Sequence, residues 1–323
     1  NSKKSDTTDI SKPWDKDNQA WWDWYVGLAD NDYKKEPIIA AEPLPDVAIP
    51  TDDEVVSELA ETYPLKNDQI DFFRKNGFIK LKKVFSPGVI LKLRAELIKL
   101  LKKEFDVDPD KEAHDRFLSL EMIWPKNTLL RAYVLSPRLG QISADLLGVS
   151  AVRLYHDNVL AKQAGCGRTP WHFDDHHFPL DTNDVVTAWV PAQPTPIDMG
   201  PLSFAYPLNV HELVNAVTFE KTGTGYDRGV SEVFKKNGVT VNETPFELGE
   251  VSFHHNLNFH TASQNRTSRS RVALANTYFR DGARVINNPT MVSGDWQKFM
   301  PNINPGDIAA SPLNPICWPV DDK

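Results

Sequence analysis

The spacing of apolar and polar residues is mostly helical in the first third of the chain. Residues 65–76 carry apolar side chains at helical spacing and stop before Gly77, which is typical of a helix end. Residues 78–81 read as a short strand. Ser86 and Pro87 are the N-cap and first residue of a second predicted helix, whose buried side is formed by Val89, Leu91, Leu93, Leu97, Leu100 and Leu101.

Strand patterns dominate after a stretch, residues 110–148, that we interpret as helical with breaks. Residues 151–162 alternate, with Val152, Leu154, His156, Asn158 and Leu160 on one side and Arg153, Tyr155, Asp157, Val159 and Ala161 on the other. Further strands are predicted at residues 184–191, 200–204, 250–259 and 271–279. Short strands with turns behind a helical front predict a mainly β fold with flanking helices around a double-stranded β-helix, the cupin-like jelly roll.

The pattern also predicts how the domain is organised. Residues 61–323 form one jelly-roll domain with a helical N-terminal part, and residues 1–60 form an extension that packs on it. Residues 211–245 are irregular with a short helix, and a connection this long is usually a functional lid or insert. The tail from Arg284, rich in Pro and Asn, is expected to wrap the domain.

An aromatic segment stands out within the extension. Trp21, Trp24 and Tyr25 lie at helical spacing, which indicates a short amphipathic helix packed on the domain. A homodimer contact through the same side chains is the alternative interpretation.

Composition narrows the class of protein. The chain has 323 residues, 41% of them hydrophobic, including nine Trp, which is enough for a sizeable core. A net charge of −8 without a basic cluster argues against nucleic acid as a partner, and no apolar run is long enough for a membrane span. The only cysteines, Cys166 and Cys317, cannot form a disulfide framework, so we expect a reducing cytoplasm.

Candidate chemistry begins at Trp171-His172-Phe173-Asp174. In an extended segment, residues two apart point to the same side, so His172 and Asp174 can converge on one point. An imidazole and a carboxylate, joined by one more imidazole, form the facial triad of a non-haem Fe(II) site with three open positions. A His and an Asp that simply hydrogen-bond near a loop are the plainer alternative.

A second stretch, residues 249–278, makes the pattern specific. His260 is followed by Asn265 five residues later and by Arg271 eleven residues later. With the Trp-His-x-Asp motif, these spacings resemble those of the phytanoyl-CoA dioxygenase family of Fe(II)/2-oxoglutarate oxygenases. The resemblance begins near residue 66 and covers about three quarters of the chain. It implies that His172, Asp174 and His260 are the iron ligands and catalytic centre, and that Arg271 binds 2-oxoglutarate.

Several residues compete for these roles. His254 and His255 are alternatives to His260, and Arg269 has the same strand parity as Arg271. The family's spacing favours His260 and Arg271. His176 and His177 are expected to lie in the pocket or behind the ligands, or to be merely structural.

The remaining cosubstrate contacts are less regular. Asn158 and Trp189 are predicted to contact the cosubstrate, with Trp189 as a pocket wall. Ala262 stands where relatives usually have a small hydroxyl residue, so Thr261 or Ser263 is expected to supply that contact. The family's Pro-Gly-Ser-His turn is also replaced, here by Pro207-Leu208-Asn209-Val210.

The resemblance implies a dioxygenase that uses Fe(II), 2-oxoglutarate and O₂ to hydroxylate an unactivated C–H bond of a small molecule. The carboxylate of Asp174 favours hydroxylation over halogenation, because halogenating relatives have Gly or Ala there. Desaturation, cyclisation and epoxidation use the same iron site and stay open. A non-catalytic binding protein and a zinc-type hydrolase are the rival classes. Phytanoyl-CoA itself is not implied, because no Lys/Arg cluster is present for the CoA phosphates.

Overall fold

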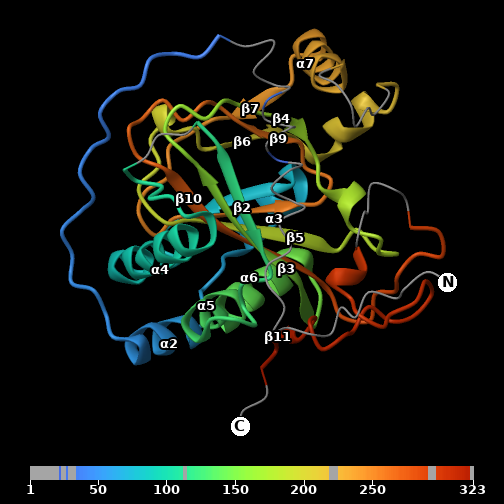
Figure 1. The fold of residues 1–323 in the computed structure, drawn as a ribbon. Helices are drawn as coiled ribbons and strands as arrows, with labels where there is room; N and C mark the ends of the chain where they lie inside the picture. The colour runs from blue at the N-terminus through green and yellow to red at the C-terminus, as the bar shows by residue number, and fades with distance from the viewer. Residues whose placement is uncertain are drawn as a thin grey trace, which may run out of the picture.

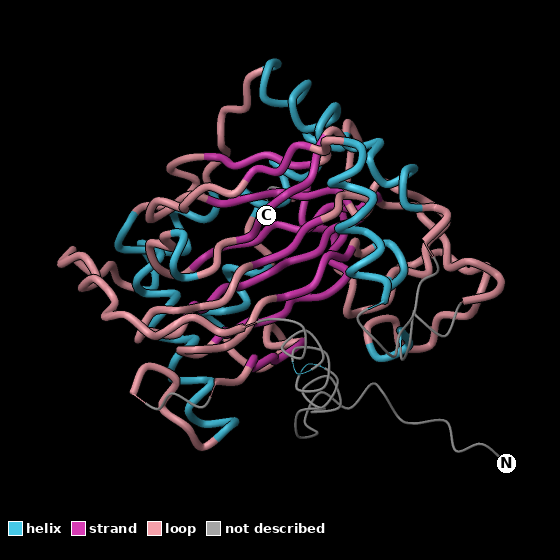
Figure 2. The backbone as a smooth tube through the Cα atoms, turned by 90° about the horizontal axis from the view of Figure 1, so that it is seen from above, coloured by secondary structure: helices cyan, strands magenta, loops and turns pink. Residues whose placement is uncertain are grey.

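The computed structural model describes most of the chain, namely residues 22, 27, 34–111, 115–217, 225–289 and 296–320. Its strands gather at the centre and its helices lie on either side (Figure 2). The mainly β architecture with a helical front is therefore confirmed.

The helices of the N-terminal part begin and end at residues that favour helix termini. They are α2 (Asp52–Ala60), α3 (Asn67–Asn76), α4 (Pro87–Phe105), α5 (Thr128–Val134) and α6 (Pro137–Leu147). Thr51 and Glu54 form a capping box at the start of α2. Gly77 ends α3 in the left-handed conformation, as predicted. Ser86 is the N-cap residue of α4, although its side chain makes no capping hydrogen bond.

The larger sheet is antiparallel. Its strands lie in the order β1 (Phe78–Leu81), β8 (Val251–His255), β5 (Val185–Pro191), β10 (Arg271–Arg280), β3 (Val152–Lys162) and β11 (Ile316–Trp318), with β2 (Phe117–Glu121) also paired to β3. Its outer face packs on α4, α5 and α6 (Figure 1), through a core that includes Leu93, Leu97, Ile142, Leu146, Val272 and Leu274.

The smaller sheet is also antiparallel, in the order β4 (Thr169–His172), β9 (His260–Ala262), β6 (Leu202–Tyr206) and β7 (Thr240–Asn242). A second apolar cluster joins the inner faces of the two sheets. It contains Phe78, Trp189, Ala273 and Ala275 from the larger sheet and Leu202, Phe204 and Ala262 from the smaller one. The interior between the sheets is where the candidate site lies.

Three expectations about strands were wrong in detail. Residues 110–148 are not only helical, because Phe117–Glu121 forms β2 against β3. The strand expected at 250–259 ends at His255, because the chain must turn there to cross from the larger sheet to β9. The alternation in β3 also reverses at Tyr155, which the pairing with β10 skips, so Leu154 and Val159 both pack in the helix-side core.

The N-terminal extension contacts the barrel at several points. Residues 34–50 run along the outside of the domain (Figure 1), and the backbone of Ile39 exchanges hydrogen bonds with residues 266 and 268. Trp22 stacks on Phe117 with ring centroids 4.3 Å apart, so this aromatic residue does pack on the domain. Trp21, Trp24 and Tyr25 lie outside the described residues.

Residues 211–245 supply β7, the edge strand of the smaller sheet, and helices that cover the outer face of that sheet. The 3-10 helix η3 (Leu208–Val214) and the helix α7 (Gly225–Asn237), which is longer than expected, pack there. Their cluster contains Val210, Val214, Tyr226, Val230, Phe234 and Phe259. Asp227 of α7 pairs with Arg168 and accepts a hydrogen bond from the backbone N–H of Trp171, so α7 is tied to the strand that carries His172.

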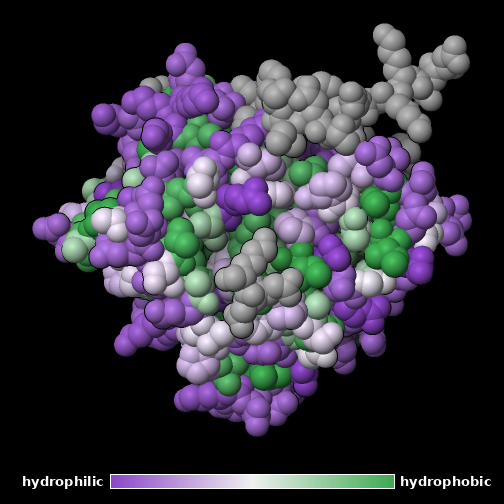
Figure 3. Space-filling view, turned by 90° about the horizontal axis from the view of Figure 1, so that it is seen from below, coloured by the Kyte–Doolittle hydropathy of each residue, from purple (hydrophilic) through white to green (hydrophobic). Residues whose placement is uncertain are grey.

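The C-terminal tail covers one end of the larger sheet. After η5 (Trp296–Lys298), Phe299 and Met300 pack with Tyr155 and Phe279. Among the described residues no helix is long and apolar enough to cross a membrane. On the face shown in Figure 3, apolar residues form small groups separated by hydrophilic ones.

Candidate metal centre and cosubstrate site

Strand pairing brings the three predicted metal ligands together. His172 is the last residue of β4, His260 is the first of β9, and the two are direct partners in the antiparallel ladder. Asp174 follows two residues after His172. One nitrogen or oxygen atom from each side chain lies within 4.8 Å of the others. Two imidazoles and a carboxylate therefore converge in the interior.

Each imidazole is oriented by a backbone carbonyl. His172 Nδ1 lies 2.9 Å from the oxygen of Pro170, and His260 Nδ1 lies 3.0 Å from the oxygen of Asn258. A carbonyl only accepts, so Nδ1 carries the hydrogen in both rings. The Nε2 lone pairs then face Asp174 Oδ1, at 3.9 Å from His172 and 3.7 Å from His260. Carbonyl-oriented imidazoles of this kind are typical of metal-binding histidines.

The electrostatics of the cluster favour a cation. Burial would raise the pKa of Asp174, but His260, His254 and His172 together hold that pKa well below its usual range. Burial and the neighbouring His172 ring push the pKa of His260 well below its ordinary value. At neutral pH the cluster thus presents an ionised carboxylate beside the neutral imidazole of His260, which is the form that binds a divalent metal.

A third imidazole, His254, also reaches Asp174. Its Nε2 lies 3.2 Å from Asp174 Oδ2, the oxygen opposite the one that faces His172 and His260. Sequence reasoning treated His254 only as a competitor of His260. The alternation of side chains along β8 could have identified it. His254 faces the interior on the same side as Ser252, whereas His255 faces the other way, towards Phe73.

The histidines just after Asp174 lie on the short 3-10 helix η1 (Asp175–His177). His176 packs on the ring of Phe173, with centroids 4.3 Å apart. His177 keeps exposed surface, yet burial lowers its pKa to about 4.

Arg271 is a buried basic residue of the interior. It opens β10, is 1% exposed, donates to the carbonyl of Gly200 and lies over the ring of Trp189, with its guanidinium carbon 5.3 Å from the centroid. Burial lowers its pKa to about 10, so it stays charged at neutral pH. Among the described residues it forms no ion pair, and its Nε has no hydrogen-bond partner. Arg269 instead reaches outward to the carbonyl of Glu42.

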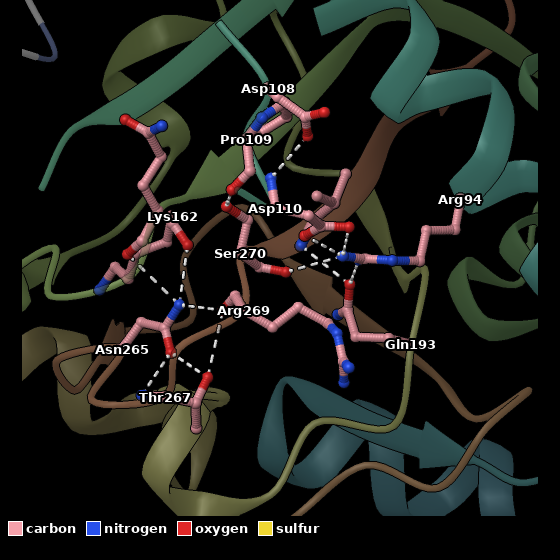
Figure 4. Close-up of polar contacts among 12 residues, drawn as sticks. Arg94, Asp108, Pro109, Asp110, Lys162, Gln193, Asn265, Thr267, Arg269 and Ser270 are labelled. Carbon is pink, nitrogen blue, oxygen red and sulfur yellow. Dashed lines mark hydrogen bonds and ion pairs between the residues drawn. The ribbon is translucent and has the colours of Figure 1, made fainter. Parts of the chain in front are cut away.

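A polar network fixes the backbone on both sides of Arg271; Figure 4 shows its part around Arg94, Gln193 and Ser270. Arg94 of α4 donates to the carbonyl of Ser270, to both oxygens of Asp110 and to Gln193 Oε1. The same Gln193 oxygen accepts from the N–H of Val272 at 3.0 Å. The residues before and after Arg271 are thus held by one buried cluster.

Comparison with known proteins agrees with this geometry. A sequence model of the family Phytanoyl-CoA dioxygenase (PhyH) matches residues 73–273, more than half of the chain. The chain belongs to the phytanoyl-CoA dioxygenase family. The peroxisomal phytanoyl-CoA dioxygenase of Mus musculus is 24% identical over 261 residues, which are 74% of this chain and 76% of the mouse protein. Membership makes the chain an oxygenase.

Solved structures give the same fold. The alpha-ketoglutarate-dependent carbocyclase SnoK from nogalamycin biosynthesis aligns with a TM-score of 0.63 at 24% identity, covering 78% of this chain and 96% of SnoK. EctD from S. alaskensis, crystallised with 2-oxoglutarate and 5-hydroxyectoine, aligns with a TM-score of 0.57 at 16% identity, covering 79% and 93%. The predicted jelly-roll core of this phytanoyl-CoA dioxygenase family member is confirmed.

Asn265, at the family's position five residues after the distal His, organises a loop. Its amide nitrogen donates to the carbonyls of Lys162 and Arg269, and its oxygen accepts from the hydroxyl of Thr267 (Figure 4). These bonds hold the chain that leads from β9 to Arg271.

The other predicted cosubstrate residues are divided between the interior and the surface. Trp189 lies beneath Arg271, and Asn158 is half-buried, its oxygen accepting from Ser119 at 2.9 Å. The hydroxyl of Ser263 instead donates to Glu243 at 2.8 Å on the exposed side, and that of Thr261 donates to the carbonyl of Thr169. Neither hydroxyl is directed at Arg271 by these bonds.

Sequence reasoning also missed Lys162. This residue is the direct strand partner of Arg271, is fully buried, and donates from Nζ to the carbonyl of Ser263 at 2.8 Å. Two buried basic side chains therefore lie side by side at one end of the interior. Only the pairing register of β3 and β10 reveals this, because the two residues are far apart in sequence.

Proposed function

We propose that this family member is an Fe(II)- and 2-oxoglutarate-dependent dioxygenase that hydroxylates an unactivated C–H bond of a small organic molecule, releasing succinate and CO₂. One observation carries the proposal: His172, His260 and Asp174 converge in the interior, which also contains Arg271, a buried cation that forms no ion pair among the described residues. This donor set suits Fe(II) and leaves three positions open.

The cosubstrate fits the same interior. A buried guanidinium without an anion is costly, and a bidentate carboxylate is its best partner. The distal carboxylate of 2-oxoglutarate would satisfy the unpartnered Nε of Arg271 and supply the missing negative charge. Two apolar rings would exclude water between the candidate metal centre and Arg271. One is Phe204, whose ring centroid is 6.4 Å from that of His260, and the other is Trp189, which lies beneath Arg271.

The bound iron, with O₂ and the keto acid, supplies the oxidising chemistry. The chain's own residues bind and orient. His172, Asp174 and His260 would hold the metal, and Arg271 would fix the orientation of the keto acid. Asp174 keeps a carboxylate where a halogenating enzyme needs space, which supports hydroxylation. Desaturation, cyclisation and epoxidation remain alternative outcomes at the same centre.

The test is succinate formation from 2-oxoglutarate under air, with purified protein, added Fe(II) and a panel of small metabolites. Turnover that requires both Fe(II) and O₂ supports the proposal, and mass spectrometry of the product distinguishes a gain of oxygen from a loss of hydrogen. A non-catalytic protein would form no succinate with any metabolite. A zinc-type hydrolase would keep its activity without O₂ and without keto acid.

The domain organisation and setting belong to the same proposal. Residues 61–323 form the oxygenase domain and residues 1–60 an extension whose aromatic segment is the candidate dimer contact. Residues 211–245 act as a lid or insert. A reducing cytoplasm suits both ferrous iron and the buried thiols of Cys166 and Cys317.

A further inference from the structure

We infer that His254 is a positioning residue for the metal centre: it binds the outer oxygen of Asp174 and keeps that carboxylate monodentate. The inference rests on the proposed function, because it concerns the same metal site. It goes further by giving a role to a histidine that lies outside the group of three ligands.

The two oxygens of Asp174 have different neighbours. Oδ1 faces the Nε2 atoms of His172 and His260, whereas Oδ2 faces Nε2 of His254 at 3.2 Å. An ionised carboxylate only accepts, so the hydrogen must be on Nε2 of His254. His254 therefore has the opposite tautomer to His172 and His260, whose hydrogens are on Nδ1.

The surroundings of His254 make this arrangement rigid. The residue is 2% exposed and lies in β8, where its direct strand partners are Phe78 and Thr187. Its ring is close to those of Phe204 and His260, with centroids 5.8 Å and 4.4 Å away. Its Nδ1 is buried and has no hydrogen-bond partner in the part of the chain that the structure describes, so moving the hydrogen there would leave a buried donor unsatisfied.

The end of β8 also holds the backbone of Asp174. The carbonyl of Asn256, two residues after His254, accepts from the N–H groups of Asp174 at 2.9 Å and of Asp175 at 3.1 Å. The strand β8 and the residue just after it thus hold both the main chain and the side chain of Asp174, which lies just after β4 of the smaller sheet. With Oδ2 engaged, only Oδ1 faces the other two ligands, which preserves open positions for cosubstrate and O₂.

The test measures metal binding in the absence of turnover, by titrating the metal-free protein with Co²⁺ in a calorimeter. We expect His254→Phe to weaken binding about 10- to 100-fold, the usual effect of losing a group that orients a ligand. His254→Gln, which keeps an N–H donor, should recover most of the affinity. His255→Phe is the matched control, since it makes the same change one residue later on the opposite face and should bind as the wild type does.

A second measurement needs no mutation of the site. Long-range ¹H–¹⁵N NMR of the metal-free protein should show the hydrogen of His254 on Nε2 and those of His172 and His260 on Nδ1, with the His254 signal assigned through its proximity to the rings of Phe204 and His260. A hydrogen on Nδ1 of His254 overturns the inference even where a variant fails to fold.

The outcomes separate the inference from the proposed function. Wild-type affinity in His254→Phe overturns the positioning role while leaving the metal site intact. Equal loss in His254→Phe and His254→Gln makes His254 a ligand and also overturns it. Wild-type protein that binds no Co²⁺ overturns the proposed function, and the inference with it.

Discussion

Arg271→Met tests the cosubstrate site most directly. The substitution removes the guanidinium but keeps a long apolar side chain above Trp189, so the buried volume changes little. A hydrogen bond to a charged group contributes about 1.5–3 kcal/mol. Since each 1.4 kcal/mol is a factor of ten, losing one such bond raises the KM for 2-oxoglutarate about 10- to 150-fold.

The assay is succinate formation as a function of 2-oxoglutarate concentration at saturating Fe(II) and O₂. Arg269→Met is the matched control, because Arg269 lies two residues earlier and reaches outward to the carbonyl of Glu42. We expect the KM of this control to equal that of the wild type. An unchanged KM in Arg271→Met, or an increase only in Arg269→Met, would refute the assignment of Arg271 as the anchor.

Three further predictions address the ligand, the support of Arg271 and a buried acid. Asp174→Ala should abolish Fe(II)-dependent succinate formation and Co²⁺ binding while the circular dichroism spectrum stays unchanged. Arg94→Met should raise the KM for 2-oxoglutarate and destabilise the fold by about 3–5 kcal/mol in urea titrations, because it breaks a largely buried charged network; wild-type values of both would contradict the network's role. Burial raises the pKa of Asp157 to about 7 in the folded protein, from a value near 4 in the unfolded chain. The protonated carboxyl therefore stabilises the fold at low pH, and this contribution is lost as the pH rises from about 4 to 7. The stability of Asp157→Asn relative to the wild type should therefore increase over that window, by up to about 4 kcal/mol, and a pH-independent difference would show that Asp157 is ionised in the fold.

Periodicity was sufficient to predict most strands and the ends of two helices. Gly77 and Pro87 mark α3 and α4 because their backbone preferences are local. The strand β10 is recognisable because most of its residues are apolar; in the structure ten of them pair with β3 and seven also pair with β5. The local pattern gave the wrong prediction at β2. These residues were expected within a broken helical stretch, but they form a strand because they pair with β3 and are buried there.

The candidate ligands could be predicted because their spacing along the chain is fixed by the turns between short strands. His254 and Lys162 could not be assigned in the same way. Their roles depend on which residues lie opposite them in space, namely Asp174 across the two sheets and Arg271 across a strand pair. Only the strand register and the crossing of the chain from β8 to β9 determine those partners.

The smaller sheet carries the candidate ligands, and the larger sheet holds them in position. The candidate ligands lie on or just after β4 and β9, which have four and three residues and share few ladder bonds of their own. Strands this short cannot fix a coordination geometry without support. The larger sheet supplies that support through His254 in β8 and through the Arg94 network at the start of β10. Changes on the larger sheet should therefore alter metal and cosubstrate affinity even where they touch neither ligand.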